Sequence, residues 1–207
     1  MNARVKKILS ILKKLYPKAK CSLVFKTPLQ LLVATILSAQ CTDERVNIVT
    51  KELFKKYKTA EDFAKVKQNT LGATIRSVGF YNNKSKNIIK CCKDIVAKHK
   101  GKVPKTMEEL IKLAGVARKT ANVVLGNAYD IQAGIAVDTH VMRLSKRLGL
   151  TKKKTPEKIE KDLMNIFPKK EWTMLSHYLI WHGRAVCKAP TPLCKQCKLS
   201  KLCPKIF

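Results

Sequence analysis

Apolar residues recur at intervals of three and four positions along most of the chain, whereas the alternation typical of strands is almost absent. The stretch from Leu31 to Leu37 is apolar on every side, which predicts a central, buried helix. Thr27, Pro28 and Gln30 stand before it as an N-cap, a first-turn proline and a capping-box glutamine. The pattern as a whole predicts an all-α fold.

Further helix starts are marked by threonines that precede segments with helical periodicity. These threonines are Thr42, Thr59, Thr106 and Thr155. A turn is expected over residues 79–82, followed by a helix with Ile88, Cys92 and Ile95 on one face that Gly101 ends. A last helix is expected from Trp172 to Arg184.

The first seventeen residues form an amphipathic pattern with one apolar and one basic face. The apolar positions are Val5, Ile8, Leu9, Leu12 and Leu15. A membrane-surface helix or a transit peptide shares this pattern, but a helix packed on the body of the protein is the favoured interpretation. No secretory segment is visible, and the longest apolar run is too short to span a bilayer. We expect a soluble, cytoplasmic protein that does not bind membranes.

Charge narrows the choice of partner. The 207 residues include 43 Lys and Arg against 14 Asp and Glu, a formal net charge of +29. A polyanion is the natural partner, with nucleic acid ahead of an anionic membrane. The alternative is that lysine serves only as a general solubilising residue, since the lysines are spread over the whole chain.

The eight cysteines fall into two groups. Cys21, Cys41, Cys91 and Cys92 are scattered, whereas the other four crowd together near the C-terminus with the spacing C-x6-C-x2-C-x5-C. These four are Cys187, Cys194, Cys197 and Cys203. Without a secretory segment a disulfide framework is not expected, so the clustered group indicates a metal site. From spacing alone, zinc is slightly favoured over an iron–sulfur cluster.

A helical hairpin is expected over about residues 106–129, with its turn at 114–117. Such hairpins are common in helical proteins. Here the turn leads into Arg118, Lys119 and Thr120, at a helix start whose unpaired N–H groups and positive dipole end favour an anion. A DNA phosphate would fit this site without sequence preference.

Five segments together resemble the endonuclease III family of DNA glycosylases. They are LSAQCTD at 37–43, GFYNNK at 79–84, LAGVARKTANVVL at 113–125, IAVDTHVMR at 135–143 and the cysteine cluster at 187–203. They occur in one order and cover essentially the whole chain. The resemblance implies a helical barrel domain over 22–131 and a second helical domain made of 1–21 and 132–207, which carries the cysteines.

The resemblance also implies roles for individual residues. Lys119 matches the family's nucleophilic lysine and Asp138 its catalytic aspartate, although Asp138 also reads as a helix N-cap. Gln40 matches the glutamine that enters the base stack, and Phe80 occupies the position of an apolar wedge. Taken singly, these two would read as a solvent-facing loop residue and a core phenylalanine.

The same resemblance assigns DNA contacts to the hairpin, to the residues beside the lysine, and to one histidine. These residues are Gly115, Ala117, Arg118, Thr120 and His140. It also reverses the choice of metal, to a [4Fe–4S] cluster with a structural and DNA-docking role. His140, His177 and His182 are interpreted as structural rather than as metal ligands, because no partner spacing is convincing.

The implied activity is base excision repair of double-stranded DNA by a monomer. The enzyme would remove oxidised pyrimidines and cleave the strand on the 3′ side of the abasic site. A lysine amine explains both steps, because its Schiff base with the opened sugar acidifies the C2′ proton and allows β-elimination. The base must first be flipped out and the gap filled, which suits Gln40 and Phe80.

The sequence departs from the family at the hairpin, where Ala114 and Ala117 replace a proline and a glycine. Alanine keeps the N–H that binds phosphate, provided that the backbone does not need a positive φ. The loop between Cys187 and Cys194 carries only Lys188 as a cation. Two rivals remain: an adenine-mismatch glycosylase, which would lack the lysine, and a non-catalytic helix-hairpin-helix module stabilised by metal.

Overall fold

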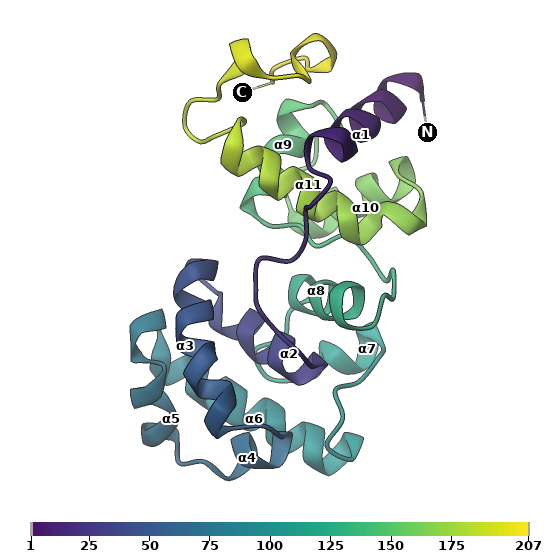
Figure 1. Cartoon of the computed structure of the whole chain (residues 1–207). Coiled ribbons are helices and arrows are strands. Elements are labelled where there is room, and N and C mark those ends of the chain that lie inside the picture. Colours follow the sequence, from purple (N-terminus) through teal and green to yellow (C-terminus); the bar gives the residue numbers. More distant parts are fainter. Residues whose placement is uncertain (1, 207) are drawn as a thin grey trace. The chain divides into compact units, whose positions relative to one another are not determined.

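The computed structural model describes residues 2–206, which form helices and connecting turns without any strand (Figure 1). The predicted all-α fold is confirmed. The chain divides into two compact units: unit 1 comprises the segment up to Lys20 and the segment from Gln132 onwards, and unit 2 comprises Cys21–Ile131. The chain therefore begins and ends in unit 1.

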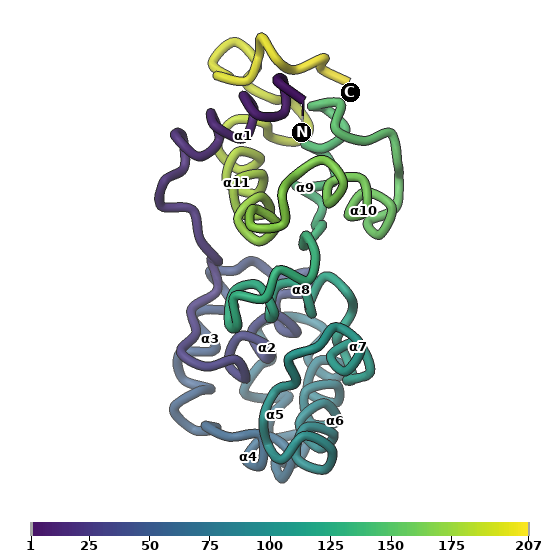
Figure 2. Tube along the Cα trace, turned by 90° about the vertical axis from the view of Figure 1, so that its right-hand side faces the viewer, coloured from purple at the N-terminus to yellow at the C-terminus, as the bar shows by residue number. Residues whose placement is uncertain are grey.

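Unit 2 is built around two helices that its other helices contact. Helix α2 packs against α3, α6 and α8, while α4 and α5 pack along α6 (Figure 2). The elements are α2 (Pro28–Leu37), α3 (Asp43–Lys56), α4 (Ala60–Lys65), α5 (Gln68–Thr74), the 3-10 helix η1 (Arg76–Val78), α6 (Tyr81–His99), α7 (Met107–Leu110) and α8 (Arg118–Ala128).

The predicted central helix is confirmed, since every residue from Leu31 to Leu37 is buried in α2. The hydroxyl of Thr27 accepts a hydrogen bond from the Gln30 N–H at 3.2 Å, as an N-cap does. The Gln30 side chain, however, accepts a hydrogen bond from the N–H of Lys26 at 2.7 Å. A capping box would use the N–H of Thr27, the next residue along the chain. Helix α4 has a complete capping box, formed by Thr59 and Asp62.

Two predicted boundaries in unit 2 are wrong. The turn expected over 79–82 is shorter, because α6 already begins at Tyr81 with Phe80 as its N-cap. The first helix of the hairpin is expected to reach the turn at 114–117, but α7 ends at Leu110. Beyond it, Leu113 N–H donates to Leu110 O, an i to i+3 bond that tightens the chain into turns and leaves Ile111 exposed.

Unit 1 has its own core, formed by α1, α9, α10 and α11. Its elements are α1 (Ala3–Leu15), α9 (Thr139–Arg147), α10 (Pro156–Ile166), the 3-10 helix η2 (Lys169–Glu171), α11 (Trp172–Ala185), and the 3-10 helices η3 (Cys194–Gln196) and η4 (Ser200–Leu202). The apolar face of α1 lies in this core, as the favoured interpretation of the first residues requires. Leu15 is the exception and lies exposed at its end.

Long basic side chains fasten α1 to the rest of unit 1. Arg4 Nη1 donates to Leu148 O at 2.8 Å and to Leu202 O at 2.9 Å. At the other end of α1, Lys13 pairs with the buried Glu171. The N-terminal helix is thereby joined both to α9 and to the cysteine segment.

None of the helices between residues 2 and 206 is both long and apolar enough to cross a membrane.

A pH dependence of stability follows from His177 in α11. Burial lowers the pKa of His177 from 6.5 to about 4, so the folded chain keeps this ring neutral while the unfolded chain protonates it below pH 6.5. The free energy of unfolding should therefore fall by about 2 kcal/mol between pH 8 and pH 5 on account of this residue. Urea unfolding at the two pH values should show a correspondingly smaller loss in His177→Gln. Equal losses in the two proteins would contradict this assignment.

Candidate functional site

The helical hairpin of unit 2 consists of α7, a turn around Gly115, and α8. Gly115 has a φ of +75°, and a Cβ added there would lie 3.0 Å from Cβ of Asn87 in α6. Backbone conformation and packing therefore both favour glycine at this position. Ala117, by contrast, has a φ of −88° and a ψ of 169°, an extended conformation that any residue adopts. The alanine at 117 causes no backbone strain.

Helix α8 starts without a side-chain cap, because Ala117 at its N-cap has no side-chain oxygen. Its first turn has no acidic residue and begins with the exposed Arg118 and Lys119. Thr120, in the same turn, is buried. The residues expected to contact phosphate thus lie together at one basic helix start, where the positive end of the helix dipole adds to their charge.

Gln40 and Phe80 occupy two exposed turns of unit 2 in the same unusual conformation. Gln40 follows α2 with a φ of +53°, and Phe80 precedes α6 with a φ of +48°. Phe80 is 62% exposed, so the alternative that it belongs to the core is wrong. A left-handed backbone is uncommon for residues other than glycine and persists only where the surroundings hold it.

A buried lysine that the motifs do not single out hydrogen-bonds to the segments that lead into both turns. Lys84 is only 5% exposed, and its Nζ donates to Leu37 O and to Val78 O, each at 2.9 Å. Burial lowers the pKa of this ammonium, and the nearby Cys41 opposes that shift. A signal was available, because Lys84 stands at helical spacing on the apolar face of α6 that also carries Ile88.

Asp138 and His140 belong to unit 1, at the start of α9. Asp138 is the N-cap, and its Oδ1 accepts a hydrogen bond from Val141 N–H at 2.8 Å. The cap interpretation is confirmed, and it uses one of the two carboxylate oxygens. His140 lies in the first turn, where its Nδ1 is 3.1 Å from Nη2 of Arg143. Arg143 also donates to the carbonyl oxygen of Cys187, which joins α9 to the cysteine segment.

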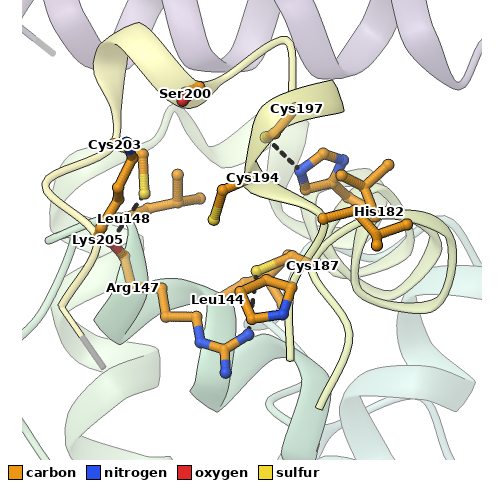
Figure 3. Close-up of a pocket in the computed structure, with 13 residues that line it drawn as sticks. Leu144, Arg147, Leu148, His182, Cys187, Cys194, Cys197, Ser200, Cys203 and Lys205 are labelled. Atoms are coloured by element: carbon orange, nitrogen blue, oxygen red, sulfur yellow. Dashed lines mark hydrogen bonds between the residues drawn. The ribbon is translucent and has the colours of Figure 1, made fainter. Parts of the chain in front are cut away.

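The four clustered cysteines line a single cavity of about 30 Å³ in unit 1 (Figure 3). Burial raises the pKa of both Cys197 and Cys203, and the neighbouring thiols raise it further. Among residues 2–206, no three His, Cys, Asp or Glu side chains are arranged to hold a single metal ion. The cavity nevertheless brings together the thiol donors that the sequence spacing singled out.

Side-chain nitrogens lie beside two of these four sulfurs. Nη1 of Arg147 lies 3.5 Å from Sγ of Cys187 and also donates to Lys188 O at 2.8 Å. Nε2 of His182 lies 3.5 Å from Sγ of Cys197, and a dashed line marks this interaction in Figure 3. Nδ1 of the same ring is 2.8 Å from the hydroxyl of Tyr16. Burial lowers the pKa of His182 to about 4, so this ring is neutral near pH 7. This ring is placed to hydrogen-bond to a cysteine sulfur rather than to serve as a metal ligand in place of a cysteine.

Residues 33–169 match a family model described as HhH-GPD superfamily base excision DNA repair protein. Endonuclease III of Synechocystis is 57% identical over 201 residues, which cover 97% of this chain and 92% of that protein. A solved non-covalent endonuclease III–DNA complex is 47% identical, with a TM-score of 0.93 over 99% of this chain and 97% of that one. A trapped endonuclease III–DNA covalent intermediate is 46% identical, with a TM-score of 0.94 and the same coverage.

The exposure of Phe80 leads to a stability prediction. Phe80→Ala should change the free energy of unfolding by no more than about 0.5 kcal/mol, because the ring contributes little to the core. The matched control is Phe63→Ala, which removes a ring only 1% exposed and should cost about 3–5 kcal/mol. Chemical denaturation of the two variants measures both values. A loss at Phe80 comparable with that at Phe63 would show that the ring packs inside.

Proposed function

The chain belongs to the HhH-GPD superfamily of base excision DNA repair proteins, in its endonuclease III branch, and we propose which of its residues perform the reaction. The protein is a DNA glycosylase with AP lyase activity. The assignment of residues rests on the position of Lys119. Its amine is exposed in the first turn of α8, a basic helix start without a side-chain cap. A phosphate held at this start would bring the DNA backbone beside the amine.

The substrate is double-stranded DNA with a damaged base or an abasic site. Endonuclease III–DNA complexes among the similar solved structures support DNA as the partner, as does the net charge of +29. We assign oxidised pyrimidines as the bases removed, in keeping with the endonuclease III branch. Gly115, Ala117, Arg118 and Thr120 would bind the backbone through the helix start, a contact without sequence preference.

The reaction proceeds through a covalent bond between Lys119 and the sugar. Nζ attacks C1′ and the bond from C1′ to the base breaks, after which the sugar ring opens to give a protonated Schiff base. Loss of the C2′ proton then expels the 3′ phosphate as the bond from C3′ to oxygen breaks. Water releases the sugar and restores the amine. One nitrogen therefore serves both base removal and strand cleavage.

Asp138 supplies the negative charge for this chemistry. The helix cap occupies Oδ1, and the second oxygen of the carboxylate accepts a proton or stabilises positive charge on the sugar. His140, one turn into the same helix, is assigned to DNA contact, with its ring oriented by Arg143. Gln40 and Phe80 fill the space left by the flipped nucleotide, because both are exposed on turns of unit 2.

Cys187, Cys194, Cys197 and Cys203 would hold a [4Fe–4S] cluster. The donor set fits, because four thiols line one cavity and each can bind one iron as a thiolate. With a thiolate at Cys197, Nε2–H of His182 donates to sulfur, and its Nδ1 accepts from the Tyr16 hydroxyl. When bound, the cluster supplies a rigid core for the C-terminal segment, which Arg147 and Arg4 tie to α9 and α1.

Borohydride trapping tests the assignment of Lys119. Incubation with duplex DNA that carries one abasic site, followed by reduction, should give a covalent adduct with the wild type. Lys119→Ala should give none and should lower strand cleavage by at least about a thousandfold. Lys93→Ala, which removes an exposed lysine of α6, is the matched control and should react as the wild type does. No adduct from intact, DNA-binding wild type would leave only a binding module.

Visible absorbance tests the metal assignment. The purified protein should absorb broadly in the visible range, as an iron–sulfur cluster does and a zinc site does not. Cys197→Ser should lose this absorbance and most of the bound iron, whereas Cys21→Ser, which changes a scattered cysteine, should keep both. A colourless protein that binds one zinc ion per chain would overturn the cluster in favour of zinc.

A further inference from the structure

Among residues 2–206, Lys84 is the one lysine that is buried. It is 5% exposed on the buried face of α6, yet it carries an ammonium group. Its two hydrogen bonds run to backbone carbonyl oxygens, of Leu37 and of Val78, both at 2.9 Å. Burying a charge is unfavourable unless hydrogen bonds to partner groups compensate for the lost hydration. The position of those two carbonyls in the fold indicates the role of the buried ammonium.

Both carbonyls lie at the ends of helices. Leu37 is the last residue of α2 and Val78 the last residue of η1. The final carbonyl groups of a helix have no partner within it, and at the end of α2 the helix dipole adds negative potential. A single ammonium has three N–H donors and can satisfy both groups at once. Lys84 therefore fastens the end of one helix to the end of the other.

These two helix ends lead directly into the exposed turns of unit 2. Leu37 precedes Gln40 by three residues, and Val78 precedes Phe80 by two. In addition, the backbone N–H of Lys84 donates to Phe80 O at 3.0 Å. Lys84 therefore holds the backbone at two points around Phe80. Its side chain binds Val78 O, before the turn, and its main-chain N–H binds Phe80 O.

We propose that Lys84 is a positioning residue that fixes the turns of Gln40 and Phe80 relative to each other, so that the two side chains enter DNA as a pair. This inference rests on the function proposed above for those two residues. Both have left-handed backbones, and both side chains are exposed, so their own packing does not hold the turns in place. The local turn bonds, such as Cys41 N–H to Ser38 O, act within one segment only.

The same face of α6 also supports the hairpin. Asn87, one turn after Lys84, lies against Gly115, where a Cβ would come within 3.0 Å. The turns that present Gln40 and Phe80 and the turn that leads to Lys119 consequently share one helix as their base. A displacement of the turns that carry Gln40 and Phe80 would therefore affect extrusion of the nucleotide. The hairpin would keep its contact between Gly115 and Asn87.

The test separates extrusion from chemistry. Base release is measured in single-turnover reactions on a duplex with one oxidised pyrimidine, and strand cleavage on a single-stranded oligonucleotide with one abasic site. Lys84→Met, which keeps the length and removes the charge, should slow the first reaction about 10- to 100-fold and leave the second within about twofold. Lys84→Arg, which can donate to both carbonyls, should recover most of the duplex rate.

A double-mutant cycle provides the control. In a chain that already carries Gln40→Ala and Phe80→Ala, Lys84→Met should lower the duplex rate by less than about threefold more, since the residues it positions are gone. If the methionine variant does not fold by circular dichroism, Lys84→Gln, whose uncharged side chain is too short to donate to both carbonyls, replaces it throughout. Equal losses on both substrates, unchanged rates on both, or a full additional loss in the double background would each overturn the proposal. Inactivity of the wild type on both substrates would instead refute the proposed function.

Discussion

Four of the side chains assigned to DNA and to chemistry lie at or near the ends of helices, where backbone groups have no partner within the helix. Gln40 follows α2, Phe80 precedes α6, Lys119 stands in the first turn of α8, and Asp138 precedes α9. Each end is satisfied differently. The carboxylate of Asp138 caps its own helix, the buried Lys84 binds carbonyls at two helix ends, and α8 has no side-chain cap at all. The uncapped start is the one that a phosphate can complete.

Burial, rather than charge, distinguishes the roles of the basic residues. With a formal net charge of +29, attraction to a polyanion is a property of the whole chain and identifies no particular residue. Lys84 is buried on carbonyls, Arg147 is buried beside Cys187, and Lys119 is exposed at a helix start. The first two hold backbone in place, and the third is free to reach a ligand. The same chemical type thus serves structure or reaction according to its surroundings.

The helices were predictable because their signals are local. Thr27, Thr42 and Thr59 accept the hydrogen bonds that mark helix starts, and the apolar run of α2 is buried throughout. The candidate site could be predicted only through motifs, since periodicity does not separate Phe80, which is exposed, from a core phenylalanine. Contacts between distant positions were out of reach. Arg147 and Cys187 are 40 residues apart, and neither spacing nor capping relates them.

The covalent bond between one particular amine and the sugar can be located by peptide mapping of the reduced adduct. The wild type is trapped with borohydride on abasic duplex DNA, digested with nuclease and protease, and analysed by mass spectrometry. We expect the sugar remnant on Nζ of Lys119. Attachment to another lysine or to the N-terminal amine, with Lys119 unmodified, would contradict it.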